Sequence, residues 1–311
     1  MDSPMNVAII GAGRRNNGIG EYVAKYFHAA GADVPGVLGT THQSASAAAA
    51  RLKAYGIQAR AFTEFPAMID ACRPDAVVIS SPTATHRQYI ECCLDAGVHV
   101  FCDKPFVPPD DPDVSTFIMD VTARSRAAGV VIGMNSQWPF CLGSYEELCG
   151  GVDRERIESF SMRLSPVARG REMIPDSVPH TLSLLRCTLG PGRIDGIAFT
   201  GGADSLGISF AYHGECATCS VHVDLVREMT QPRTMAFGFN GCMAGRIIDL
   251  ESYTIYLTCK GKTLKITDPL ELSVRDFIAA AEQVREPLIG CRHILDTSSL
   301  LQQIYRAYSS V

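Results

Sequence analysis

The first half of the chain alternates short apolar runs with amphipathic stretches. Asn6 to Ile10, Val34 to Leu38 and Ala76 to Ile79 are short apolar runs next to turn residues, as buried parallel strands are. Between the first two runs, apolar residues from Ile19 to Ala30 recur at the spacing of one helix face. The alternation continues to a run at Val130 to Met134. This pattern predicts a doubly wound parallel sheet.

The pattern changes after about Gly150. Alternating apolar and polar segments follow one another there with turn residues between them, at Ile197 to Thr200, Ile208 to Tyr212, Thr218 to Leu225 and Tyr253 to Leu257. Helical spacing returns after Asp176 and beyond Ser273. We therefore expect a second domain, residues 136–311, with an antiparallel sheet covered on one face. We expect residues 1–135 to form the first domain. In an alternative arrangement, the C-terminal helix leaves the second domain and packs on the first.

Composition and charge narrow the class of protein. A chain of 311 residues, 46% of them hydrophobic, can bury one large core or two. The formal net charge of -5 leaves no broad basic surface for nucleic acid. Apolar runs stay well short of the roughly 18 residues that span a bilayer, and the first residues lack a signal-peptide pattern, so we expect a cytoplasmic protein. The 12 cysteines are scattered, and we expect reduced, apolar side chains without disulfide bonds.

Glycines gather directly after the first predicted strand. A dinucleotide-binding loop needs glycine where the chain turns tightly, where the backbone approaches the pyrophosphate and where the helix packs on the strand. The first amides of the helix then hold the negative charge. Gly11, Gly13 and Gly18, followed by Ile19, are the candidate cofactor-binding residues of this loop. A glycine-rich surface turn is the alternative.

The loop departs from the common Gly-x-Gly-x-x-Gly spacing. Arg14 to Asn17 lengthen it before the second pair of glycines. Arg14 and Arg15 either contact a phosphate or remain solvated.

The end of the second predicted strand bears on the choice of cofactor. A carboxylate there accepts the ribose hydroxyls of NAD, whereas small hydroxyl groups tolerate the extra phosphate of NADP. This chain has Thr40, Thr41 and Ser44 after Leu38, and no acid. We therefore prefer NADP to NAD, with Thr40 and Ser44 as the cofactor contacts. A capping role for Ser44 in the next helix is the alternative.

Lys104 stands just after another predicted strand, Val98 to Cys102. Before that strand, a turn at Ser81 and Pro82 leads into an amphipathic helix from His86 to Ala96. Lys104 therefore falls at the carboxyl end of a strand, where open α/β sheets bind their ligands.

Four motifs of the first half occur in order: Gly11-x-Gly13, Ser81-Pro82-Thr83-x-x-His86, Ala96-Gly97-Val98-His99-Val100 and Asp103-Lys104-Pro105. Together they resemble the glucose-fructose oxidoreductase, inositol dehydrogenase and MocA family of NAD(P)-dependent oxidoreductases. The resemblance is strong to about Asn135 and loose beyond. It implies a cis peptide bond before Pro105, and cofactor contacts from Ser81, Pro82, Thr83, His86, Asp103 and Lys104. The family usually has Glu-Lys-Pro where this chain has Asp103.

The resemblance also implies the architecture. We expect an N-terminal Rossmann-like domain that binds NAD(P), and a C-terminal α+β domain with a mostly antiparallel, open-faced sheet. That second domain would bind the substrate and join the chain into a homodimer or homotetramer.

Asp176 and His180 form a second candidate group. Their spacing places them on one side of a helix if the segment from Thr181 to Leu189 is helical. A histidine exchanges protons near neutral pH, and an aspartate can orient it. The family motif Asp-x-Gly-x-His-x-x-Asp is matched at both residues and missed at Val178 and Ser183. A helix cap and a partly buried surface histidine are the alternative.

These residues predict an NAD(P)-dependent dehydrogenase or reductase. Lys104 would stabilise the reacting oxygen, His180 would exchange its proton, and Asp176 would hold the imidazole. The resemblance implies a sugar, cyclitol or related small molecule as substrate, and Gln137, Trp138 and Ser183 are candidate contacts. Trp138 packed between domains is an alternative. A biosynthetic imine or carbonyl reductase and a cofactor-binding sensor without catalysis are the alternatives for the whole chain.

Residues His213, Cys216, Cys219 and His222 have a spacing that invites a zinc interpretation. In strands, however, side chains three residues apart point to opposite faces, so four ligands would not converge. We assign no metal site.

Overall fold

The computed structural model describes residues 4–13 and 18–308, and the chain divides into two compact units. Unit 1 comprises Met1–Pro108, Ser115–Asn135 and Leu270–Ile294. Unit 2 comprises Pro109–Val114, Ser136–Pro269 and Leu295–Val311. One division falls between residues 135 and 136, where the sequence analysis divided the chain. The segment Leu270–Ile294, which we had placed in the second domain, belongs to unit 1.

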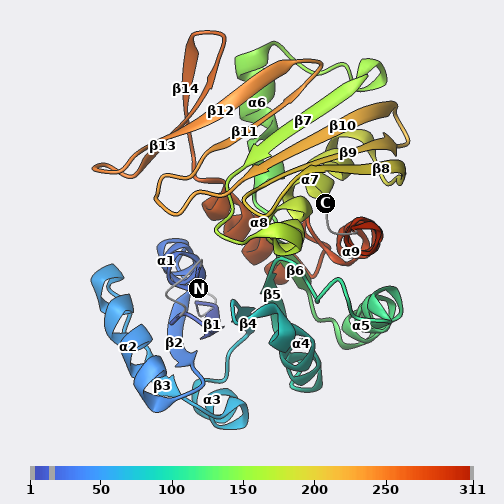
Figure 1. Ribbon diagram of the computed structural model, residues 1–311. Helices are drawn as coiled ribbons and strands as arrows, with labels where there is room; N and C mark the ends of the chain where they lie inside the picture. The colour runs from blue at the N-terminus through green and yellow to red at the C-terminus, as the bar shows by residue number, and fades with distance from the viewer. Residues whose placement is uncertain (1–3, 14–17, 309–311) are drawn as a thin grey trace. The chain divides into compact units, whose positions relative to one another are not determined.

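Unit 1 contains a six-stranded parallel sheet with the strand order β3-β2-β1-β4-β5-β6 (Figure 1). Its strands are β1 (Asn6–Ile10), β2 (Asp33–Leu38), β3 (Arg60–Phe62), β4 (Ala76–Ile79), β5 (His99–Asp103) and β6 (Ile132–Asn135). The helices of this part are α1 (Gly20–Ala29), α2 (His42–Leu52), α3 (Phe65–Cys72), α4 (His86–Asp95), α5 (Val114–Ala128) and α8 (Pro269–Gln283). The strand order reverses between β1 and β4, so the two halves of the sheet diverge at the ligand-binding edge. The predicted doubly wound sheet is confirmed.

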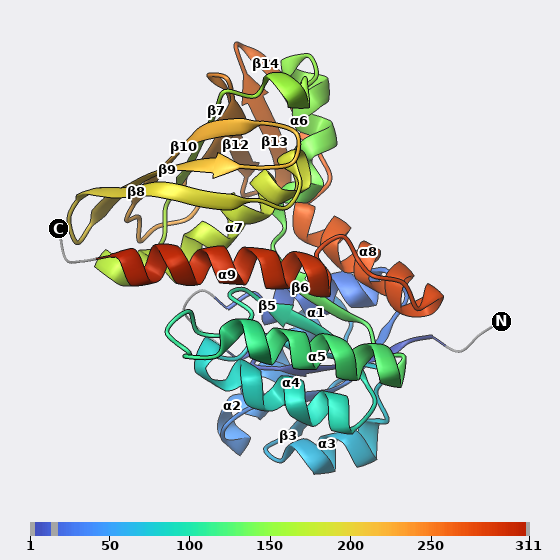
Figure 2. The same cartoon turned by 90° about the vertical axis from the view of Figure 1, so that its right-hand side faces the viewer.

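Both faces of this sheet are covered by helices. Helices α1 and α8 share an apolar core with one face, where Phe27, Phe101 and Phe277 pack ring against ring at centroid distances of 5.1 to 6.0 Å. Gly133 makes room for Phe277, because a Cβ there would lie 2.9 Å from its ring. Helices α4 and α5 run in front of the strands in Figure 2. The aromatic contacts of α8 explain why its segment belongs to unit 1.

Unit 2 contains an eight-stranded sheet with the order β14-β13-β12-β11-β7-β10-β9-β8. Its strands are β7 (Ser159–Leu164), β8 (Arg193–Gly201), β9 (Ser205–His213), β10 (Thr218–Val226), β11 (Met235–Phe239), β12 (Cys242–Asp249), β13 (Thr254–Cys259) and β14 (Lys262–Ile266). The remaining helices are α6 (Leu142–Cys149), α7 (Met173–Leu189) and α9 (Cys291–Ala307). Strands β7 and β10 pair in parallel, and the other neighbours are antiparallel. The predicted, mostly antiparallel sheet is confirmed.

One face of the second sheet forms the core of unit 2. Along β10 buried and less buried residues alternate, with Val221 and Val223 inside and Ser220 and His222 outside. Helices α6 and α7 pack against the inner face. Helix α7 begins at Met173, so Asp176 lies in its first turn and His180 one turn further along. Within the described residues, we find no helix both long and apolar enough to cross a membrane.

Candidate active site

The glycine loop joins the ends of three neighbouring strands. Gly11 has a φ of 84°, which favours glycine, and its N–H donates to Leu38 O at 3.0 Å. A Cβ at this position would lie 2.5 Å from the backbone nitrogen of Ser81. Any larger residue at Gly11 would therefore push apart the turns that follow β1 and β4. The structure brings these two predicted cofactor residues into contact.

The rest of the loop leads into α1. A Cβ on Gly13 would approach Ser44 O at 3.2 Å, and a Cβ on Gly20 would lie 2.9 Å from Ala12 Cα. Gly18 and Ile19 immediately precede the helix, and Ile19 is its N-cap residue. The open amides of the first turn can therefore bind an anionic group near this loop. The predicted Arg14 and Arg15 contacts lie outside the described residues.

The end of β2 carries a helix cap. Thr41 is the N-cap of α2, and its Oγ1 accepts the Ser44 N–H at 3.1 Å. The Ser44 hydroxyl in turn accepts the Thr41 N–H at 3.1 Å, which completes a capping box. Ser44 thus has the helix-capping role that we considered as the alternative, although the N-cap itself is Thr41. Thr40 is exposed at the strand end and has no carboxylate beside it in the segment Gly39 to Ser44.

Arg51 is a functional candidate that the sequence analysis missed. It lies about two turns beyond Ser44 on α2. Its Nη2 is 3.5 Å from Ala12 O in the glycine loop, and its Nε pairs with Glu21 of α1. The contact depends on how α1 and α2 pack, which the motif spacing does not reveal.

His86 connects two loops at the sheet edge. It is 1% exposed, with Nε2 2.9 Å from Ser81 O and Nδ1 3.0 Å from Pro105 O. Burial lowers the pKa of His86 despite the opposing effect of the Asp103 charge, so the neutral ring is favoured. A neutral ring donates only one N–H, and the Cys102 thiol, 3.3 Å from Nδ1, can donate to the other nitrogen. His86 therefore lies buried between the two loops and, in its neutral form, donates to the carbonyl oxygen of only one of them. Its contact with the cofactor stays a prediction.

Thr83 and Pro82 belong to the short turn between β4 and α4. Pro82 is exposed, and Thr83 begins a single 3-10 turn that ends at Thr85. The Thr85 hydroxyl donates to Ser81 Oγ at 2.7 Å. This turn therefore fixes the Ser81 side chain and leaves Pro82 and Thr83 at the surface of the carboxyl edge.

Lys104 follows β5 directly. The Asp103 carboxylate accepts the Lys104 N–H at 2.8 Å and faces the Asn135 amide nitrogen at 3.5 Å. Asp103 and Asn135 are register partners at the ends of β5 and β6. The other amide atom of Asn135, Oδ1, is buried without a hydrogen-bond partner among the described residues. The Lys104–Pro105 peptide bond is cis, as the family resemblance implied.

Among the described residues of unit 2, Ser136 and Trp138 lie beside His180. Its Nδ1 lies 3.3 Å from Ser136 Oγ, and its ring meets the Trp138 ring edge to face, with centroids 6.3 Å apart. Asp176 lies one turn before it on α7, and both side chains are half-buried. Ser136 was not among the predicted residues, because nothing in its sequence neighbourhood relates it to α7.

The predicted substrate residues differ in their surroundings. Gln137 is half-buried, whereas Trp138 is buried in the core of unit 2 and has the Arg246 guanidinium 5.3 Å from its ring centre. Ser183 is fully buried, and its Oγ has no hydrogen-bond partner among the described residues. Arg246 comes from β12 and is a candidate that the sequence analysis missed.

The residues of the zinc interpretation lie in different environments. Cys219 is buried, whereas His222 is on the outer face and lies 3.1 Å from Ser209 Oγ. His213 is 2.8 Å from the Asp195 carboxylate. The alternation along β10 therefore places Cys219 and His222 on opposite faces of the sheet, as the strand pattern predicted.

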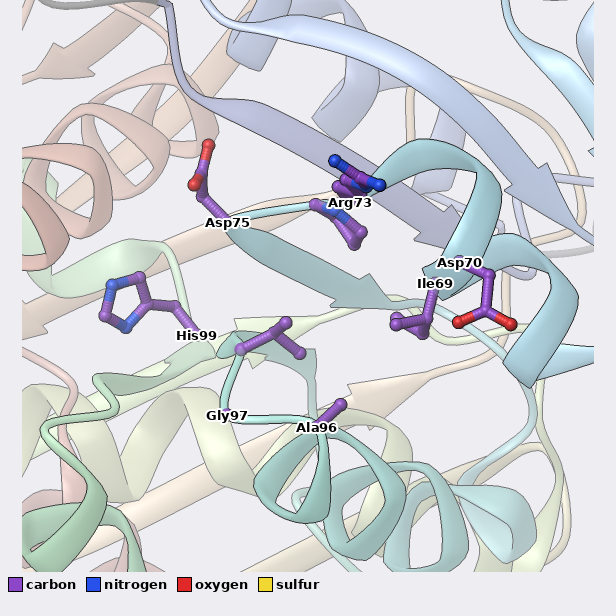
Figure 3. A pocket seen from close by; sticks show the side chains of 9 residues that line it. Ile69, Asp70, Arg73, Asp75, Ala96, Gly97 and His99 are labelled. Atoms are coloured by element: carbon purple, nitrogen blue, oxygen red, sulfur yellow. The ribbon is translucent and has the colours of Figure 1, made fainter.

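A surface pocket of about 640 Å³ lies at the amino-terminal edge of the parallel sheet (Figure 3). Arg73, Asp75 and His99 line it, just before β4 and at the start of β5. Asp75 accepts the Asn6 N–H at 2.7 Å, and His99 Nδ1 accepts the Val131 N–H at 2.9 Å. Since these polar atoms hold the backbone, and ligands of such sheets bind at the opposite edge, we assign no catalytic role to this pocket.

Comparisons with known proteins agree with this fold. Residues 5–131 match the model of the GFO_IDH_MocA family, described as an oxidoreductase family with an NAD-binding Rossmann fold. D-glucoside 3-dehydrogenase of Escherichia coli is 29% identical over 153 residues, 48% of this chain and 40% of that protein. Inositol 2-dehydrogenase of Acidothermus cellulolyticus is 27% identical over 195 residues, 60% of this chain and 53% of that protein. The aligned segments thus span about half or less of these curated relatives.

Solved structures share the whole architecture. UDP-N-acetylglucosamine 3-dehydrogenase GnnA of Acidithiobacillus ferrooxidans has a TM-score of 0.71 at 19% identity, with 97% of each chain covered. KijD10, a 3-ketoreductase of Actinomadura kijaniata solved with NADP, has a TM-score of 0.71 at 15% identity, with 99% of each chain covered. At such identities the likeness concerns the fold alone. Residues 5–131 are thus similar to the NAD-binding Rossmann domain of the GFO_IDH_MocA oxidoreductase family.

Proposed function

We propose that this protein is an NAD(P)-dependent oxidoreductase that transfers hydride between the nicotinamide and a hydroxyl or keto carbon of a sugar, a cyclitol or a related small molecule. The observation that carries this proposal is Lys104. It follows β5 at the ligand-binding edge of the sheet, and its own N–H is bonded to Asp103. Gly11, where φ is positive and a Cβ would meet the Ser81 backbone, fits the tight turn that a dinucleotide-binding loop needs.

Each proposed catalytic residue has a distinct role. When bound, the dinucleotide supplies or accepts the hydride. Lys104 donates a hydrogen bond to the reacting oxygen and stabilises its negative charge. His180 accepts the alcohol proton in oxidation and returns it in reduction, and Asp176 holds the imidazole. If Ser136 Oγ accepts the Nδ1 proton, Nε2 keeps the lone pair that this exchange requires.

For the cofactor, we propose NADP as the preferred form. Its support is the lack of an acid between Gly39 and Ser44 and the exposed Thr40 hydroxyl at the end of β2. Solved relatives were crystallised with either cofactor, KijD10 with NADP and an oxidoreductase of Agrobacterium radiobacter with NAD+. Dissociation constants for NADPH and NADH, measured on one preparation, test the preference. Tighter binding of NADH would contradict it.

The substrate class rests on the relatives, which are named as sugar and inositol dehydrogenases and a 3-ketoreductase. Val178 and the buried Ser183 stand where the family motif has glycine and an acid, so a substrate other than a plain polyol is expected. Oxidation of NADPH and NADH should be followed with keto-sugars, keto-inositols and cyclic imines. Turnover of a keto compound supports the proposal. Turnover of imines alone would favour a biosynthetic imine reductase. Tight cofactor binding without any turnover would favour a cofactor-binding sensor.

We also propose a cytoplasmic homodimer or homotetramer formed through the outer face of the second sheet. The support is the row of exposed residues on β10, Thr218, Ser220 and His222, which leaves this face available for a second copy. Light scattering tests this proposal. A mass equal to one chain at micromolar concentration would contradict it.

A further inference from the structure

Three cysteines from different elements of unit 2 converge. Cys149 is the last residue of α6, Cys242 the first of β12 and Cys259 the last of β13. Their sulfur atoms all lie within 4.8 Å of one another, and those of Cys242 and Cys259 are 3.5 Å apart. The residues are far apart in the sequence, so no spacing motif indicates the cluster.

Tyr145 fixes the geometry of this cluster. It lies one turn before Cys149 on α6, and its hydroxyl donates to Cys242 O at 2.7 Å. The Tyr145 hydroxyl oxygen also accepts the Phe239 N–H at 3.0 Å. Because these two bonds hold α6 against the β11–β12 hairpin, Cys149 stays beside Cys242 without a ligand. The site is therefore preorganised.

The distances and charges suit a metal ion. Zn²⁺ bound to sulfur at about 2.3 Å in a tetrahedron separates the sulfurs by about 3.8 Å, within the range seen here. Thiolates select Zn²⁺ and Cu⁺ over hard cations. Cys149 and Cys242 are partly exposed, whereas Cys259 is buried, so an ion could enter from one side and find its third ligand inside. Lys260 interacts with Cys242 and offsets part of the negative charge of three thiolates.

We propose that Cys149, Cys242 and Cys259 bind one thiophilic d¹⁰ metal ion, Zn²⁺ with water as a fourth ligand or three-coordinate Cu⁺. This site does not depend on the oxidoreductase activity proposed above. Three thiols lose their protons to solvent as the ion binds, and no electron is transferred.

The full-length protein, reduced and freed of metal under anaerobic conditions, should be titrated with Zn²⁺ against a chromophoric zinc chelator and with Cu⁺ against a copper(I) chelator. We expect one ion per chain, and the tighter-binding arm identifies the metal. Cys242→Ser and Cys259→Ala should weaken binding by at least about tenfold. Cys216→Ser, which removes an exposed thiol outside the cluster, is the matched control and should bind like the wild type. Equal binding by the wild type and both cluster variants would overturn the proposal.

A second measurement needs no substitution. The wild-type protein is alkylated with iodoacetamide with and without Zn²⁺ or Cu⁺, and the modified cysteines are located by peptide mass spectrometry. The bound ion should protect Cys149 and Cys242 and leave Cys216 reactive. Unchanged labelling of the cluster in the presence of either ion would contradict the site. So would a protein that binds no metal after any Cys242–Cys259 disulfide has been reduced.

Discussion

The carboxyl edge of the parallel sheet and the surroundings of His180 hold their functional groups in different ways. At the sheet edge, Gly11, Ser81 and Lys104 each follow a strand, and main-chain hydrogen bonds or close backbone contacts place them. Around His180, Ser136 comes from the segment after β6 and Arg246 from β12. In a parallel sheet, the residues that follow neighbouring strands lie at the same edge, so the sequence predicts that they are close together. Side-chain contacts between a helix and distant segments do not follow from the sequence order.

The largest effect is expected at the sheet edge. Lys104→Met should lower kcat by about 10³-fold, because the developing negative charge on the reacting oxygen loses its hydrogen-bond donor. The dissociation constant of NADPH should change little, since the glycine loop is intact. Steady-state kinetics and fluorescence titration give the two values. Lys262→Met on the exposed β14 is the control, and an unchanged kcat in Lys104→Met would remove this lysine from the mechanism.

A smaller effect is expected around His180. Ser136→Ala should lower kcat by about tenfold and shift its pH dependence, because Nδ1 loses a neighbour that selects the tautomer. His180→Asn, measured in the same assay, should lower kcat by about 10²-fold or more. It should also abolish the part of the pH dependence of kcat that arises from the histidine. Ser136→Thr, which keeps the hydroxyl, should restore the wild-type profile. If Ser136→Ala changed stability alone, its kcat profile would coincide with that of the wild type.

The choice of cofactor should respond to the end of β2. Thr40→Asp places a carboxylate where NAD-binding proteins accept the ribose hydroxyls, so the ratio of NADPH to NADH affinity should fall by about tenfold. Ser44→Ala should leave that ratio unchanged and destabilise the fold by about 1 kcal/mol, because it breaks the capping box with Thr41. Titration with both cofactors and thermal unfolding separate the two effects. A ratio that moves with Ser44→Ala and stays constant with Thr40→Asp would reverse these roles.

The smallest effect concerns the pH dependence of stability. Burial lowers the pKa of His86 in the folded protein below the value of about 6.5 in the unfolded chain. The unfolded state then binds more protons at low pH. The contribution of His86 to the free energy of unfolding is therefore fully present above about pH 6.5 and is lost as the pH falls below this value. For one group the slope is at most about 1.4 kcal/mol per pH unit. His86→Asn should flatten the slope between about pH 5 and 7 in urea unfolding, and an identical slope would show that His86 does not titrate on unfolding.

The sequence predicts the sheet edge more completely than the rest. Short apolar runs with turn residues located β1 and β4 at their observed bounds, and the loop after each strand followed from them. The capping role of Thr41 and the burial of the His86 ring could not be predicted from the sequence. The identity of a residue in a motif does not reveal whether its side chain contacts a ligand or the backbone. Phe277 and Arg246 were missed for another reason: each contacts residues more than a hundred positions away, and such contacts exist only once the elements have packed.

The most direct test of the central claim is the fate of the hydride. NADPH carrying deuterium at C4 of the nicotinamide is incubated with the wild-type protein and the panel of keto-sugars, keto-inositols and cyclic imines, and the products are analysed by mass spectrometry. We predict deuterium at the former carbonyl carbon of a keto-sugar or keto-inositol product, and its loss with Lys104→Met. Tight NADPH binding by the wild type without deuterium in any product would contradict the proposed oxidoreductase.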